Sequence, residues 1–97
     1  MSQPEQPRPQ WFVLIDETMG TYLGRTLSNT VPADSQEAAV AAAERAAFTY
    51  MPRHPSSPKS RSVFRTGPNT WVVQVTGATA NFHFTVTIGT WVGTVEH

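Results

Sequence analysis

Few side chains in this sequence have a type and spacing that could carry chemistry. His54, His83 and His97 lack the spacing of metal ligands, and the chain has no cysteine to complete a zinc site with them. Asp16 and Glu17 are the only adjacent acids, but neighbouring side chains on a strand point to opposite faces. The pattern therefore favours turn residues at a strand end over an acid–base pair.

The remaining candidates are hydroxyl groups and glycines, and they support catalysis no better. Ser56, Ser57 and Ser62 have no base at a recognisable spacing, and the glycines form no phosphate-binding loop. His83 stands between two phenylalanines on the polar side of an alternating segment, which is typical of a solvated histidine on a sheet. We therefore expect a protein that is not an enzyme and that uses no metal and no cofactor.

A basic segment occupies residues 53–65. Between residues 46 and 95 the sequence contains no Asp or Glu, so the net charge of zero conceals an excess of bases after the acidic first part. With Tyr22 and Trp71 as stacking partners, these bases could follow a phosphate backbone. Seven Lys and Arg are few for a nucleic-acid-binding domain, so this is the second hypothesis. Its candidate residues are Arg53, Lys59, Arg61 and Arg65.

The composition predicts one small domain. The 97 residues suffice for a single core, and the absence of cysteine excludes disulfides and thiolate metal sites. Residues 1–10, MSQPEQPRPQ, are polar and rich in proline, which predicts a disordered leader before a domain over residues 11–97. No apolar run approaches the roughly 20 residues that cross a bilayer. We expect a cytoplasmic protein without membrane contact, with a composition compatible with a bacterial source.

One segment, 32–51 (PADSQEAAVAAAERAAFTYM), has the pattern of an α-helix. Alanine fills its interior, Asp34 or Ser35 can serve as the N-cap, and Pro52 prevents continuation. At helical spacing, one side carries mostly small apolar residues, which would let the helix lie close to a sheet. That side consists of Val40, Ala43, Ala47, Tyr50 and Met51.

The rest of the chain predicts strands. Residues 10–16 include five consecutive large apolar residues and 21–29 return after a turn, which predicts an antiparallel hairpin. Residues 62–66 and 70–76 flank a Gly-Pro-Asn turn. Residues 82–88 alternate most clearly, with Phe, Val and Ile at even positions and His and Thr at odd ones. The even face should meet the helix.

The end of the chain breaks this alternation at Gly89. A straight strand over 81–95 would be about 50 Å long, whereas a domain of this length has a radius of gyration of about 12 Å. Two interpretations remain open. Gly89 forms a bulge that bends the strand around the sheet, or the final residues pair with another chain.

The resulting order, ββαβββ, predicts an α+β fold with a mainly antiparallel sheet of about five strands and the helix on one face. The helix opening ADSQEAAVAAA after a hairpin resembles the corresponding part of small ββα modules, including antitoxins of the HicB type. This resemblance covers only a short stretch without a specific motif, so it implies the local arrangement and no activity.

The second face of the sheet gives the leading hypothesis. Phe12, Leu14 and Val72, with Phe64 or Val63, should project away from the helix, and exposed apolar patches mark interfaces. Alternatively, the leader or the basic loop folds back over this face. We expect a protein-interaction module, most simply a homodimer, that uses the open sheet face or the last strand. Its candidate interface residues are Phe12, Leu14, Val72, Trp91 and Val92.

Overall fold

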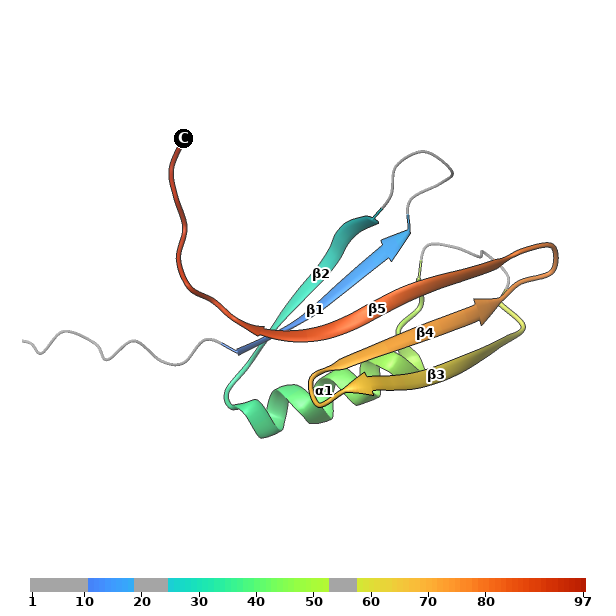
Figure 1. Ribbon diagram of the computed structural model, residues 1–97, viewed down its shortest axis with the longest axis horizontal. Coiled ribbons are helices and arrows are strands. Elements are labelled where there is room, and N and C mark those ends of the chain that lie inside the picture. Colours follow the sequence, from blue (N-terminus) through green and yellow to red (C-terminus); the bar gives the residue numbers. More distant parts are fainter. Residues whose placement is uncertain (1–10, 19–24, 53–57) are drawn as a thin grey trace, which may run out of the picture.

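The computed structural model describes residues 11–18, 25–52 and 58–97 of the chain. Its elements follow one another in the predicted order ββαβββ (Figure 1), which confirms the α+β fold class. They are β1 (Trp11–Thr18), β2 (Arg25–Ala33), α1 (Gln36–Thr49), β3 (Ser60–Gly67), β4 (Thr70–Thr76) and β5 (Asn81–Thr90).

All five strands form one antiparallel sheet in the order β2-β1-β5-β4-β3. The last strand in the sequence is therefore the middle strand of the sheet and joins the two hairpins. Helix α1 connects the two edge strands and lies across one face of the twisted sheet (Figure 1). Within the described residues, no helix or strand covers the other face, so the molecule has two layers there.

The helix begins after Ser35, one of the two predicted N-caps, and ends at Thr49, two residues before the end of the predicted segment. The Ser35 hydroxyl accepts a hydrogen bond of 3.0 Å from the amide of Ala38, and this N-cap places the first helical residue at Gln36. Pro32 and the residue after it belong to β2 instead. The edge position of that strand makes the missing amide of proline tolerable.

The sheet-facing side of the helix also differs from the prediction in detail. Ala43 and Ala47 are completely buried, as predicted, and Val40 and Tyr50 are partly buried against the core. Met51 is 64% exposed, which contradicts its predicted place on this side. The backbone is already extended at Tyr50, so helical spacing no longer applies to the next residue.

The core beneath the helix combines alanine on one side with large residues on the other. Three alanines of the helix have no exposed surface, and the strands supply most of the volume that fills the interface. Because the small side chains bring the helix close to the sheet, the core is one continuous cluster. Its buried strand residues are Val13, Ile15, Trp71, Val73, Val75, Phe84 and Val86.

The first hairpin is confirmed, but its strands are displaced relative to the prediction. Strand β1 continues to Thr18, so the adjacent acids lie within the strand and not in a turn. The second strand was predicted over 21–29, but β2 runs from Arg25 to Ala33, four residues further along the chain. Its last residue, Ala33, pairs with Trp11 at the start of β1. The predicted residues Tyr22 to Gly24 lie outside the described part of the chain. In the second hairpin, β4 has its predicted bounds, whereas β3 is longer than 62–66.

Gly89 does not form the predicted bulge. It pairs with Phe12 in a register between β1 and β5 that contains no shift. The strand avoids the overhang by ending at Thr90, and residues 91–97 leave the sheet as an exposed tail (Figure 1). A side chain at position 89 would place its Cβ 3.2 Å from Leu14 Cδ1. The absence of a side chain at position 89 therefore leaves room for the Leu14 side chain on the neighbouring strand.

Candidate interaction surface

The face of the sheet opposite α1 carries apolar residues, because β1 is apolar at consecutive positions. Val13 and Ile15 are buried beneath the helix, so the alternation of the strand directs Phe12 and Leu14 to the opposite face. Strand register extends this face, since directly opposite residues share a side of the sheet. We call it the open face.

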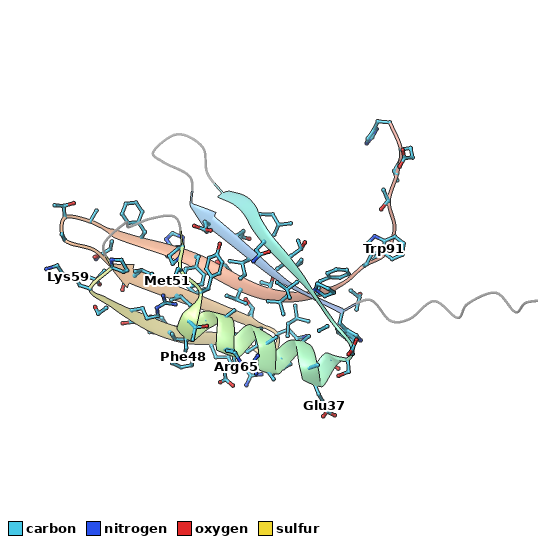
Figure 2. All side chains as sticks on the ribbon, turned by 180° about the vertical axis from the view of Figure 1, so that it is seen from behind. Glu37, Phe48, Met51, Lys59, Arg65 and Trp91 are labelled. Carbon is cyan, nitrogen blue, oxygen red and sulfur yellow. The ribbon has the colours of Figure 1, made fainter. Side chains whose placement is uncertain are left out.

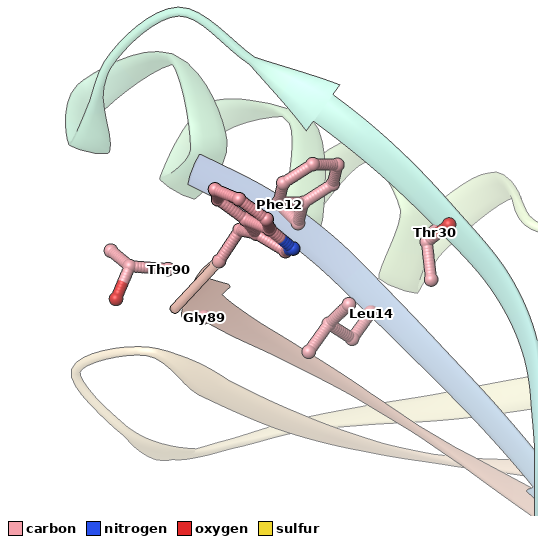
Figure 3. A pocket seen from close by; sticks show the side chains of 6 residues that line it. Phe12, Leu14, Thr30, Gly89 and Thr90 are labelled. Atoms are coloured by element: carbon pink, nitrogen blue, oxygen red, sulfur yellow. The ribbon is translucent and has the colours of Figure 1, made fainter. Parts of the chain in front are cut away.

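An apolar groove lies at one end of the open face. It has a volume of about 250 Å³ and contains no charged side chain among the six residues that line it. Figure 3 shows Phe12 and Leu14 on β1, with Thr30 on the neighbouring edge strand and Gly89 and Thr90 at the end of β5. The sixth lining residue is Trp91, the first residue of the tail.

The groove brings together three of the five predicted interface residues. Phe12, Leu14 and Trp91 line it, whereas Val72 and Val92 do not. Val72 is half-buried on the open face, opposite Thr85 of β5, and has the 54% exposed Phe64 across from it on β3. The open face is therefore apolar beyond the groove as well.

Three groove residues, Thr30, Gly89 and Thr90, and one further residue of the open face were not among the predicted interface residues. Thr30 was missed because its strand was placed four residues too early. A bulge at Gly89 was one of two open interpretations, whereas the structure shows an unshifted register in which the missing side chain leaves room for Leu14. Leu27, which is 57% exposed and pairs with Asp16, lies on the open face beyond a register shift in the first hairpin that no sequence pattern announced.

The predicted basic residue Arg61 has a structural partner on the helix-covered face. Its guanidinium donates hydrogen bonds to the carbonyl oxygens of Ala47, at 3.0 Å, and Tyr50, at 2.7 Å. These carbonyls belong to the last turn of α1, where backbone acceptors lack helical partners and attract positive charge. Partial burial lowers the pKa of Arg61 from its ordinary value, and arginine nevertheless remains charged. The guanidinium also lies 5.8 Å from the ring centroid of Phe84.

Arg65 is likewise bound within the chain. It donates to the carbonyl oxygens of Gly67, at 3.2 Å, and Pro68, at 2.7 Å, and its guanidinium lies 5.0 Å from the Trp71 ring. These contacts hold the turn between β3 and β4.

Of the other two predicted bases, Lys59 is exposed (Figure 2) and Arg53 lies outside the described residues. The four bases are thus not shown to form one surface, and nucleic-acid binding stays a prediction without support from the geometry.

A buried carboxylate marks the same end of the helix. Glu17 is only 6% exposed, and Tyr50 donates a hydrogen bond of 2.6 Å to its Oε2 atom. The Tyr50 ring packs edge-on against Phe84, with 5.3 Å between the ring centroids. The contact ties the end of α1 to β1. The sequence did not predict this contact, because it placed Glu17 in a turn after the strand. Glu17 lies beneath the helix because β1 extends to Thr18.

Comparisons with known proteins found no matching family model, curated protein or solved structure. Across the described ranges, no helix is long and apolar enough to cross a membrane. The same residues contain no group of three His, Cys, Asp or Glu side chains that could hold a metal ion.

Proposed function

We propose that this chain is a non-enzymatic protein-interaction module that self-associates through the open face of its sheet. The observation that carries the proposal is the groove formed by Phe12, Leu14 and Trp91. Apolar side chains that surround a concave surface gain most when another apolar group displaces the water from it. A second copy of the chain is the partner we propose.

The rest of the open face supports an apolar contact. Leu27 and Phe64 are each more than half exposed and stand on opposite edge strands, while Val72 lies between the second of them and the sheet centre. Exposed apolar surface of this kind is typical of interfaces. Asp16 and Thr85 stand between Leu27 and Val72 in this row, so the apolar residues form one patch on β3 and β4 and another on β2.

Electrostatics do not oppose a pair of identical chains. The net charge is zero, so two copies carry no overall repulsion. The charged contacts that the structure shows for Arg61 and Arg65 lie on the helix-covered side of the sheet or at its turn, away from the groove. An interface at the groove, whose lining contains no charged side chain, should accordingly depend little on salt.

The experiment compares two phenylalanine variants. Phe12→Ser removes a half-buried aromatic ring from the groove, whereas Phe48→Ser removes a more exposed ring, at 58%, from the outer surface of the helix (Figure 2). We expect Phe12→Ser to lower the mass measured by light scattering to that of the monomer, with an unchanged circular dichroism spectrum. Phe48→Ser should keep the mass of the unmodified chain.

Two results would overturn the proposal. One is an unmodified chain that remains a monomer at concentrations of hundreds of micromolar, where interfaces of even modest affinity are populated. The other is an equal effect of the two variants, because a specific open-face interface cannot respond to a change on the far side of the helix.

A further inference from the structure

The tail after β5 differs in composition from an ordinary solvated segment. All seven residues from Trp91 to His97 are exposed and have no secondary structure. Three of them are large and apolar, with Trp91 at 56%, Val92 at 93% and Val95 at 76% exposure. Segments that remain solvated are usually poor in aromatic and β-branched residues. The tail thus has the composition of a strand, although it does not pair with the described strands.

The alternation of β5 indicates which tail residues would share a face if the strand were continued. Phe84 and Val86 are buried beneath the helix, so even positions face the helix and odd positions face the open side. Trp91 follows this rule, because it lines the groove on the open face. Gly93 and Val95 have the same parity and would follow on that side.

We propose that, in the dimer, the two tails pair as antiparallel strands about a twofold axis at Gly93. This inference rests on the proposed self-association and names the part of the second copy that enters the groove. Pairing about Gly93 sets Trp91 opposite Val95 of the partner subunit. Both then lie on the open face, so the partner's valine adds to the apolar lining of the groove.

This register has a physical advantage over its neighbours. An axis at Val92 would place Trp91 opposite Gly93 of the partner subunit, and an axis at Thr94 would place it opposite His97 of the partner subunit. Of these three axes, only the one at Gly93 pairs an aromatic residue with a β-branched residue, a type of cross-strand pair that stabilises sheets. The contact is isologous, so it closes as a dimer and does not propagate into a fibre.

A cysteine at the axis tests the register. The chain contains no cysteine, and a Cβ on Gly93 meets nothing within 4 Å, so Gly93→Cys introduces one unhindered thiol. Directly opposite residues in an antiparallel pair have Cα atoms about 4.5–5.5 Å apart, within the range of a disulfide. The two thiols lose two protons and two electrons to an added oxidant, oxidised glutathione, and form one interchain S–S bond.

The control is Thr79→Cys, an exposed position in the turn between β4 and β5. At micromolar protein, we expect Gly93→Cys to form the covalent dimer at least about tenfold faster, because pairing raises the effective thiol concentration. Non-reducing electrophoresis measures both rates. Equal rates for the two cysteines would overturn the proposed register.

A truncation separates this inference from the proposed function. Removing residues 93–97 leaves the groove and every strand intact, and we expect the truncated chain to be a monomer with the native circular dichroism spectrum. A truncated chain that remains a dimer, and that Phe12→Ser still dissociates, would place another part of the second copy in the groove. The open-face dimer would then stand and the tail pairing would fail. A monomeric unmodified chain would contradict both.

Discussion

The two faces of strand β1 both carry apolar side chains, but only one of these faces is covered within the chain. On the helix-covered face, Val13 and Ile15 are at most 2% exposed, because three alanines let the helix lie directly on them. On the open face, Phe12 and Leu14 from the same strand line a groove that the described elements leave uncovered. The alternation of β1 thus supplies both surfaces, and only one of them is used within the chain.

Polar contacts reinforce the difference. Two contacts hold the end of the helix on the covered face. The Arg61 guanidinium donates to backbone carbonyls at the helix end, and the Tyr50 hydroxyl donates to the buried Glu17 carboxylate. The groove has threonine hydroxyls as its polar side chains. We infer that the covered face determines the stability of the monomer, whereas the open face determines association.

Two of the three tryptophans, Trp71 and Trp91, offer the strongest contrast between the faces. Trp71 is 1% exposed, so Trp71→Ala should lower the free energy of unfolding by about 3–5 kcal/mol, through lost burial and a cavity. Trp91→Ala should change the monomer by less than about 0.5 kcal/mol, yet abolish the dimer. Urea unfolding followed by circular dichroism at dilute concentration measures the first effect, and light scattering the second. A large loss of monomer stability in Trp91→Ala would contradict the division between the faces.

Arg61 tests whether a predicted binding residue serves the fold. Arg61→Ala leaves two carbonyl groups at the helix end without their donor, and hydrogen bonds to charged groups contribute about 1.5–3 kcal/mol. We expect a stability loss in this range, measured by urea unfolding, with the dimer mass unchanged once the protein is folded. Unaltered stability would show that the guanidinium is free for another ligand and would revive the nucleic-acid hypothesis.

Because the helix lies close to the sheet, a larger side chain between them should destabilise the protein. Ala43 has no exposed surface, so Ala43→Leu should overpack the interface and destabilise the protein by about 1–3 kcal/mol. The matched control is Ala41→Leu, at an exposed position of the same helix. Thermal unfolding compares the two, and a core with unfilled space beneath the helix would accept Ala43→Leu without loss.

The N-cap should give the smallest effect. Ser35→Ala removes the acceptor of the Ala38 amide, which typically costs about 1 kcal/mol. Ser35→Asp keeps an acceptor and should retain most of the stability. If Asp34 were the effective cap, as the sequence equally allowed, Ser35→Ala would have no effect on urea unfolding.

The sequence predicted the fold class because local patterns agree with it. Alanine content and the Ser35 cap indicated the helix, and the alternation of 82–88 indicated a strand with one buried face. The second strand was misplaced because residues such as Pro32 look like a helix entrance when the edge position of the strand is unknown. The order of the strands in the sheet could not be predicted from local patterns. The central position of β5 depends on pairing between segments that are distant in the sequence.

The candidate site was also predictable only where local sequence patterns determine it. Phe12 and Leu14 were identified from strand alternation alone, and Trp91 from its place near the chain end. The place of Gly89 in the groove lining depends on the register between β1 and β5, which the sequence does not show. The role of Arg61 depends on the distance between a helix end and a strand that are separated in sequence. These are tertiary relations, and charge patterning alone assigned the arginine to a solvent-facing basic loop.

The most direct measurement is the solution mass of the unmodified chain by light scattering at low and high salt. The account predicts twice the chain mass of 10.7 kDa at both salt concentrations, because apolar burial at the open face holds the copies together. A mass of 10.7 kDa under both conditions, at a concentration of hundreds of micromolar, would contradict the account. A dimer that dissociates at high salt would also contradict it, since such an interface would depend on charge.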